Sequence, residues 1–331
     1  MRVTLLGELF PLTELELAPL VDLLQLTVRR RVDLLTTPEA LEPLLQMCES
    51  FGVLKDCYLR ALHDSESRQA TSPSMFHVRV GRTASPTRHG LDEITVNLSD
   101  AARIGERALN VLCEDETSDG AFLSAVVPPT LRARWEEVMA QGLLVPVTAG
   151  GVTNVPRRLS PLKHDPLVAA RTFVLIDSDA DAPWRAPGLP PPASFDRLPA
   201  NTGKAVRAAQ AIPVAIEVLG RRMAENYIPP AALSRWCDQL TEAAQADKRP
   251  HVEAFVRLPG DRQRFHHLKA AWTLDGDGAL INCDKNDPSR RGGSLGDELW
   301  KAFKLRDDAE LRDYGVYDEL APLFQTLLGL V

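Results

Sequence analysis

The 331-residue sequence predicts an α/β protein built on a parallel sheet with flanking helices. An N-terminal α+β region precedes that sheet, and a mostly helical C-terminal region follows it. Two observations carry this prediction. Apolar strand-like segments alternate with helical stretches between residues 105 and 236, which is typical of a sheet covered on both faces. The segment TFVLI, residues 172–176, has no polar alternation, as expected of a strand buried on both sides.

Residues 1–104 form the first predicted region, whose role is unknown. Residues 36–52 read as a helix, because Thr37 can cap it, Pro38 fits its first turn and Gly52 can end it. Residues 76–81 and 94–98 alternate like strands, and residues 82–90 between them read as a loop.

Residues 105–236 hold the predicted central sheet. The expected strands are residues 108–113, 143–148, 172–176 and 213–219, and the expected helices are 120–127, 131–141 and 202–211. Residues 181–203 contain six prolines, which exclude a helix or a central strand. We expect this segment to be a surface loop, either a stiff spacer or a flap beside the end of the third strand.

Residues 237–331 are predicted to be mostly helical. A helix is expected to begin near Ser294, with Leu295, Leu299 and Phe303 on one face. Residues 319–331 are expected to form a C-terminal helix.

Composition excludes several classes of protein. The five cysteines show no CxxC pairing, which argues against a zinc module or a disulfide framework and favours a reducing cytoplasm. The first apolar stretch is interrupted by Glu16, Pro19 and Asp22, so we expect neither a signal peptide nor a membrane span, and a cytoplasmic location. Because the net charge is −7, any contact with nucleic acid has to come from local basic patches.

Alternating acids follow the third predicted strand directly. Asp177 and Asp179 lie two residues apart, and in an extended chain such side chains point the same way. Two close carboxylates repel unless a cation lies between them, and oxygen ligands suit Mg²⁺ or Mn²⁺. The alternative is a solvated turn.

A second acidic segment follows the first predicted strand. Glu114 closes that strand, and parallel strands end on one edge, so Glu114 is expected to meet Asp177 there. Asp115, Glu116 and Asp119 also fit the acidic first turn of a helix. After the second strand, residues 150 and 151 are glycines, which suit either a phosphate contact or a tight turn.

Basic residues gather in two later segments. Arg221 and Arg222 follow the fourth strand, shortly before Glu225. The segment RLPGDRQRFHHLKAAW, residues 257–272, carries four further cationic side chains and two histidines among its aromatic residues. It could track a phosphate backbone, although a solvated face is an equal alternative. Adjacent His266 and His267 point apart, so they are not expected to bind zinc together.

The segments VLCEDETSDGAFL, VPVTAGGVTNVP, FVLIDSDAD and IEVLGRRMAENYIP occur in an order and spacing that resembles a Toprim domain. More narrowly, the chain is similar to the Toprim nucleases of the OLD (overcoming lysogenization defect) type. The later FHHLKAAW resembles a segment of that group. The resemblance covers residues 105 to about 272. No GxxxxGK[ST] motif is present, so the ATPase domain of OLD proteins is expected to be missing.

The resemblance implies a set of site residues. It implies that one or two Mg²⁺ or Mn²⁺ ions are bound by Glu114, Asp119, Asp177, Asp179 and Glu225. It implies catalytic roles for Glu114, Asp177, Asp179 and Lys269. Nucleic-acid contacts are expected from Arg221, Arg222, Arg264 and His267. Two departures concern the acids: Asp115 replaces the usual glycine, and Asp119 lies one place beyond the common spacing.

These expectations define a divalent-metal-dependent nuclease that hydrolyses phosphodiester bonds of DNA or RNA, with DNA as the first expectation. By analogy it would be an effector of antiviral defence, controlled by a separate ATPase or sensor protein. The alternative is a non-catalytic module that binds nucleic acid or a partner protein. A topoisomerase or primase role ranks below both, because none of Tyr58, Tyr227, Tyr314 and Tyr317 has the context of a nucleophile.

Overall fold

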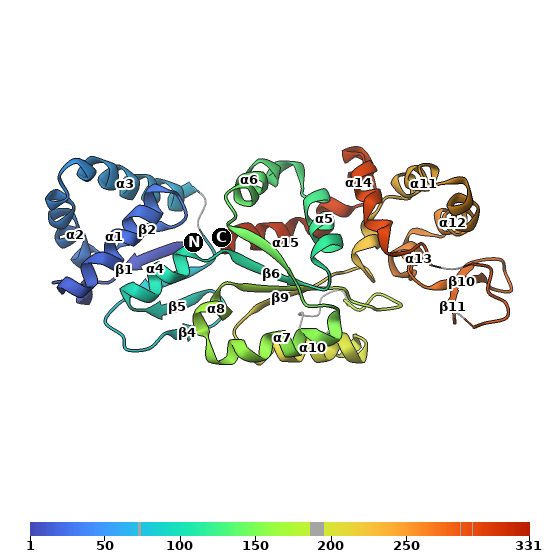
Figure 1. Cartoon of the computed structure of the whole chain (residues 1–331), viewed down its shortest axis with the longest axis horizontal. Coiled ribbons are helices and arrows are strands. Elements are labelled where there is room, and N and C mark those ends of the chain that lie inside the picture. The colour runs from blue at the N-terminus through green and yellow to red at the C-terminus, as the bar shows by residue number, and fades with distance from the viewer. Residues whose placement is uncertain (72–73, 186–194, 285, 293) are drawn as a thin grey trace.

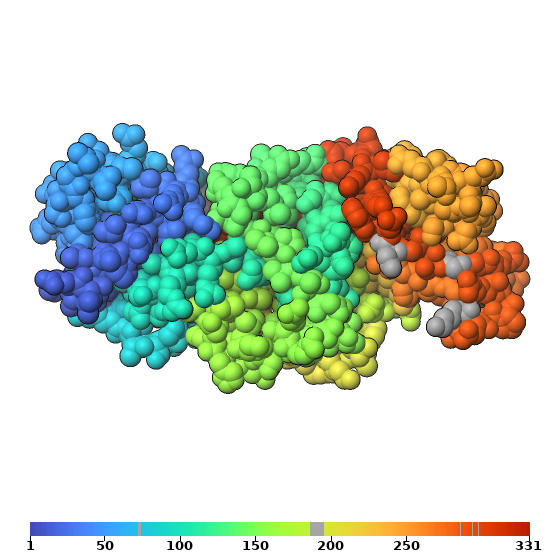
Figure 2. All heavy atoms as spheres, viewed as in Figure 1, coloured from blue at the N-terminus to red at the C-terminus, as the bar shows by residue number. Residues whose placement is uncertain are grey.

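A computed structural model describes residues 1–71, 74–185, 195–284, 286–292 and 294–331 of the chain. The molecule is elongated, and its three regions follow one another along the long axis (Figure 1). The last helix returns to the middle, so the two chain ends lie side by side. In the space-filling view the N-terminal, central and C-terminal regions remain in contact without a break (Figure 2).

The N-terminal region is a sheet covered by helices. Its strand order is β2-β1-β3-β5-β4, and every pair is parallel except β4 with β5. The strands are β1 (Arg2–Leu5), β2 (Asp33–Thr36), β3 (His77–Val80), β4 (Thr87–His89) and β5 (Glu93–Val96). The helices are α1 (Glu14–Val28), α2 (Pro38–Ser50), α3 (Lys55–Thr71) and α4 (Leu98–Glu106). Strand β4 lies inside the expected loop 82–90, and Thr37 makes no capping bond to α2.

The central sheet is parallel throughout, as expected. Its order is β7-β6-β8-β9, which places the first expected strand between the second and the third. The strands are β6 (Leu109–Cys113), β7 (Leu144–Thr148), β8 (Thr172–Ile176) and β9 (Ala215–Val218). All five residues of β8 are buried, which is what its unbroken apolar sequence predicts.

Helices cover both faces of this sheet. One face packs against α7 (Val155–Leu159) and α10 (Ala200–Gln210) in a separate apolar cluster. The other faces α5 (Glu116–Ala125), α6 (Pro129–Ala140) and α15 (Val316–Leu330), and its core runs on into the N- and C-terminal regions. Short α8 (Pro166–Ala170) precedes β8.

The C-terminal region is mostly helical, as expected, with one addition. Its helices are α11 (Pro230–Asp238), α12 (Glu242–Val256), α13 (Gly260–Phe265) and α14 (Asp308–Asp313). The addition is an antiparallel pair, β10 (Ala271–Leu274) and β11 (Leu280–Cys283). The helix expected near Ser294 is a 3₁₀ helix that begins at Asp297. It cannot begin earlier, because Gly296 takes a φ of 92°, which lies outside the helical range.

Shorter 3₁₀ segments connect these elements. They are Gly7–Leu9, Gly52–Leu54, Val152–Asn154, Ser160–His164, Phe195–Arg197 and Ala224–Tyr227. Within the proline-rich segment expected as a loop, residues 181–203, residues 186–194 lie outside the described residues. Residues 181–185 are irregular, as expected, but Phe195–Arg197 form a 3₁₀ turn and α10 begins at Ala200, so the expected loop extends too far at its carboxyl end. All five cysteines are free thiols. Among the described helices, none is long and apolar enough to cross a lipid bilayer.

Candidate metal and nucleic-acid site

The carboxyl ends of β6 and β8 bring Glu114 and Asp177 together. Glu114 is the first residue after β6, and its Oε1 accepts a hydrogen bond of 3.3 Å from the backbone N–H of Asp177. Its Oε2 accepts a second bond of 3.1 Å from the N–H of Val152, beyond β7. The expected meeting of these two acids at one sheet edge is therefore observed. It follows from the parallel pairing of neighbouring strands.

The two glycines after β7 form a tight turn around Glu114. Gly150 and Gly151 have φ of 78° and 96°, a region that favours glycine. Both N–H groups donate to the backbone carbonyl of Glu114 at 3.1 Å. These donors are already used, so the turn interpretation accounts for the glycines and a phosphate contact does not.

Asp177 and Asp179 reach the same edge by different backbone routes. Asp177 accepts a bond of 2.9 Å at Oδ1 from the N–H of Ala224. Asp179 has a left-handed φ of 53°, and its N–H donates to the carbonyl of Arg222 at 2.9 Å. The chain is therefore not extended through Asp179, and simple strand alternation does not explain its placement. Nevertheless Asp179 lies close enough to raise the pKa of Glu114.

Glu225 and Lys269 form a buried ion pair beside these acids. The Nζ of Lys269 lies 2.6 Å from Oε1 of Glu225, whose side chain is only 2% exposed. The other oxygen of Glu225, Oε2, is buried and has no hydrogen-bond partner. The Oε2 of Glu225 is therefore a buried acceptor within the cluster that could bind a cation.

Asp115 and Asp119 have different roles: Asp115 caps a helix, and Asp119 belongs to the carboxylate cluster. Asp115 caps α5 by accepting bonds from the N–H groups of Thr117 and Ser118, at 2.9 and 2.8 Å. The Oδ2 of Asp119 accepts a hydrogen bond of 3.0 Å from the backbone N–H of Asp115. Its charge is also felt by Glu114 and Asp177, so the extra residue of spacing does not remove it from the cluster.

Burial and mutual repulsion raise the pKa values of these acids. Burial, then the charges of Asp179 and Asp119, raises the pKa of Glu114 to about 7. Burial, with a contribution from Glu225, raises the pKa of Asp119 to about 6. Burial and four neighbouring acids raise the pKa of Asp177 well above its usual range. Burial also raises the pKa of Asp179, although Arg222 opposes this.

The donor set fits a hard divalent cation, but no ready-made cage surrounds it. Among the residues that the structure describes, no three or more His, Cys, Asp and Glu side chains are arranged as a finished metal centre. The acids nevertheless converge, repel one another and leave the buried Oε2 of Glu225 without a partner. Carboxylate oxygens of this kind are the ligands that Mg²⁺ and Mn²⁺ prefer.

Arg221 corrects one sequence-based expectation. Its side chain is fully buried, and it lies between the rings of Tyr227 and Tyr314, each centroid 4.4 Å away. Its guanidinium donates to Glu319 at 3.1 Å and to the carbonyls of Asn226 and Tyr314 at 2.9 Å. It therefore cannot contact nucleic acid, and it holds the loop after β9 to α14 and α15.

The other expected nucleic-acid residues stay near the surface of the site. The guanidinium of Arg222 pairs with Asp181, and Arg264 and His267 are partly exposed. Burial, then the charges of Arg222 and Lys269, lowers the pKa of His267 to about 4, so its ring is neutral at pH 7. An open groove of about 430 Å³ adjoins them. Its lining includes Asp181, Arg262, Phe265, Ile281 and Asn282.

Sequence reasoning missed the supports behind this site. Glu319 in α15 receives the hydroxyl of Tyr227 at 2.6 Å as well as the guanidinium of Arg221. Glu319 lies 92 positions from Tyr227 in sequence, and nothing in local spacing links the two. Only the return of the last helix across the sheet brings them together.

Comparisons with known proteins give no further guide: no family model, no curated protein and no solved structure matches this chain.

Proposed function

We propose that this chain is a divalent-metal-dependent nuclease that hydrolyses phosphodiester bonds of DNA or RNA, and that its catalytic region is a Toprim domain. The observation that carries the proposal is the convergence of Glu114, Asp119, Asp177 and Glu225 beside Lys269 at the carboxyl edge of the central sheet. The sequence segments that resemble OLD-type nucleases contain all five of these residues.

The acids would hold the metal, and the chain's cations would hold the substrate. Glu114, Asp119, Asp177, Asp179 and Glu225 are the ligand candidates for Mg²⁺ or Mn²⁺. A bound ion of this type supplies an activated water and stabilises charge on the transferred phosphoryl oxygens. Lys269 is a positive charge within the cluster: partial burial opposes that charge, but Glu225 and other acids raise its pKa overall. It is placed to neutralise a phosphate next to the carboxylates.

The groove beside the acids suits a nucleic-acid strand. Arg262 offers charge to the phosphates, and Phe265 and Ile281 offer apolar surface for bases or sugars. Arg264 does not line this groove, because its guanidinium lies beside Gly315. Arg222 and His267 lie at its border. Arg221 has no part in this proposal, because it is buried behind the site.

The experiment is a cleavage assay with plasmid DNA, single-stranded DNA and RNA, in Mg²⁺, in Mn²⁺ and in EDTA. The test variant is Asp177→Asn/Asp179→Asn. The matched control is Asp115→Asn, which removes a neighbouring charge while asparagine keeps the helix cap. We expect metal-dependent cutting by the wild type and the control, and at least a ~10²-fold loss in the double variant. Cutting that survives in the double variant refutes the assignment of these residues.

A second candidate function is a non-catalytic module that binds nucleic acid or a partner. The absence of a finished metal centre among the described residues favours it. Binding of DNA without cutting, in either metal, would identify this module. A role as an antiviral effector under a separate ATPase or sensor rests on the family resemblance alone.

A further inference from the structure

A basic surface lies on the helices that cover one face of the central sheet. Helices α7 and α10 pack side by side there, and their inner sides join the apolar cluster against β8 (Figure 1). Their outer sides, with the short 3₁₀ segments next to them, carry six exposed cations: Arg157, Arg158, Lys163, Arg197, Lys204 and Arg207. We call these six residues the basic face.

Few acids accompany the basic face. Residues 152–164 and 197–211, which carry it, contain neither Asp nor Glu, and no carboxylate that the structure describes forms an ion pair with any of the six cations. The neighbouring acids are Asp165, which caps α8, exposed Asp196, and Asp181, which is paired with Arg222. The six cations outnumber these acids in a chain of net charge −7, which indicates a surface for an anionic partner.

Both helices of the basic face start at the carboxylate cluster. The 3₁₀ turn that leads into α7 begins at Val152, whose N–H donates to Oε2 of Glu114 at 3.1 Å. Burial raises the pKa of Asp179, and Thr202, in the first turn of α10, lies close enough to oppose that rise together with Arg222. Helix α10 has 11 residues and is about 16 Å long. The basic face therefore extends outward from the proposed metal ligands.

The cations of α10 lie on one side of that helix and lean towards the cluster. Lys204 and Arg207 are three residues apart, so they are neighbours on the helix surface. The guanidinium of Arg207 lies over Gly203, where an added Cβ would be 3.4 Å from Nη1. It therefore points towards the N-terminal end of α10, which is the end beside Asp179. A ligand that lies along α10 meets both charges together.

The composition of the basic face favours a duplex over a single strand. Residues 152–164 and 197–211 contain no Phe, Tyr or Trp. Sites for single strands stack bases on aromatic rings, whereas a duplex keeps its bases stacked inside and presents regularly spaced phosphates. B-DNA rises about 3.4 Å per base pair, so a duplex along α10 meets that helix over about five base pairs.

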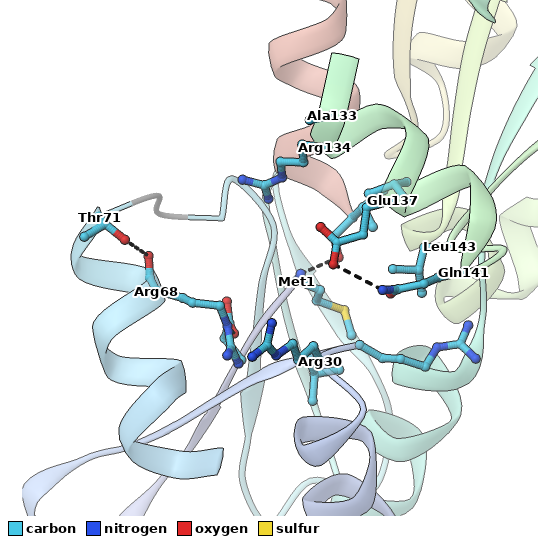
Figure 3. A pocket seen from close by; sticks show the side chains of 14 residues that line it. Met1, Arg30, Arg68, Thr71, Ala133, Arg134, Glu137, Gln141 and Leu143 are labelled. Carbon is cyan, nitrogen blue, oxygen red and sulfur yellow. Dashed lines mark hydrogen bonds and ion pairs between the residues drawn. The ribbon is translucent and has the colours of Figure 1, made fainter. Parts of the chain in front are cut away.

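The other gathering of arginines is balanced by acids. It surrounds a cavity of about 400 Å³ between the N-terminal and central regions (Figure 3). Arg68 pairs there with Asp33 at 2.6 Å, and Glu137 and the carboxylate of Val331 line the same space. Arg134 donates to a backbone carbonyl of α15 at 3.3 Å. That cavity therefore lacks the unbalanced positive charge of the basic face.

We propose that the basic face binds the phosphate backbone of duplex DNA, independently of its sequence, and holds the duplex so that one of its phosphodiesters reaches the carboxylate cluster. The choice of nucleic acid as the partner rests on the function proposed above. Arginine and lysine contacts to phosphates fix the position of a duplex but carry no sequence information. The inference therefore names the substrate of the proposed nuclease as double-stranded, and it assigns binding to residues outside the groove beside Phe265.

The test is fluorescence anisotropy of the whole chain with labelled duplex DNA, in EDTA and over a range of KCl concentrations. EDTA prevents metal-dependent cutting, so binding is measured alone. The test variant is Arg157→Gln/Arg158→Gln/Lys204→Gln. The matched control is Arg29→Gln/Arg60→Gln/Arg312→Gln, which removes three exposed cations from the N- and C-terminal regions and has the same net charge. Circular dichroism and Tm verify that both variants fold.

We expect the test variant to bind duplex DNA at least ~10-fold more weakly than the wild type, and the control to bind within about twofold. The slope of log Kd against log salt should become shallower by about 2–3, because three phosphate contacts are lost. Equal binding by the test variant and the control overturns the proposal, as does a wild type that does not bind duplex DNA. Single-stranded DNA, duplex RNA, polyglutamate or phosphatidylserine vesicles binding as tightly as duplex DNA also overturns it.

A cleavage assay of the same three proteins in Mg²⁺ and Mn²⁺ separates this inference from the proposed function. A wild type that binds duplex DNA through the basic face but never cuts it refutes the nuclease and leaves the binding surface. A wild type that cuts duplex DNA, beside a test variant that binds and cuts it equally well, refutes the binding surface and leaves the nuclease.

Discussion

Replacing Arg221 with methionine tests whether that residue supports the fold or contacts a substrate. The guanidinium is fully buried, and it serves Glu319 and two backbone carbonyls. Methionine fills much of the space but donates nothing, so these three acceptors lose their donor. Each buried acceptor left unpaired costs about 1–3 kcal/mol, and a broken buried ion pair costs about 3–5 kcal/mol. Because Glu319 is 23% exposed and water can reach it, we expect a loss near ~3–4 kcal/mol in the free energy of unfolding.

Urea denaturation followed by circular dichroism measures this loss, and calorimetry should show Tm falling by roughly 5 °C. The control is Arg262→Met, which removes an exposed arginine from the groove. That variant should keep its stability and bind DNA more weakly. Adding Glu319→Gln to the Arg221 variant should cost far less than it does alone, since the charge is already unpaired. An Arg221→Met protein within about 1 kcal/mol of wild type would refute the buried-network argument.

Three further predictions concern the cluster and its surroundings. Lys269→Met should destabilise the protein by about 2–3 kcal/mol, because it leaves buried Glu225 unpaired, and Glu225→Gln should restore most of the loss in urea denaturation. His266 is buried, and this, with the charge of a neighbouring histidine, lowers its pKa to about 3. The unfolded state then binds the extra proton between pH 6.5 and 3, so stability is complete above pH 6.5 and falls by roughly 3–5 kcal/mol towards pH 3. A His266 NMR titration midpoint near pH 6.5, the usual value for a histidine side chain, would contradict this. Gly151→Ala, at φ of 96°, should lower Tm by a few degrees through backbone strain alone, since no atom lies within 4 Å of the added Cβ.

The order of elements in the central region was predictable because its strands are strongly apolar. Residues 172–176 have no polar position to confuse the pattern, and β8 spans those residues. The N-terminal strands were harder, since β1 and β2 have only four residues each, too few to establish a period. The pair β10–β11 is held by contacts to His267 and to residues 289–292 that no local pattern encodes.

The site was predictable where strand ends determine it, and not where long-range contacts do. Glu114 and Asp177 meet because adjacent parallel strands end together. Arg221 and Arg222 are neighbours with the same side chain, yet one is buried among tyrosines and the other faces Asp181. The sequence offers no means of telling them apart, since the difference depends on where α15 returns.

Folding shifts the pKa values of two groups of acids in this chain in opposite directions. Acids with a structural partner have lowered pKa values: Arg132 and Tyr317 hold the pKa of Asp308 at about 2, and the cap of α5 lowers that of Asp115. The acids at the carboxyl edge of the sheet have raised values despite lying a few residues from such caps. Folding therefore stabilises the charge on the first set and opposes it on the second. A cluster that the fold holds together against its own repulsion does not stabilise the protein, and this is why it supports the functional site proposed above.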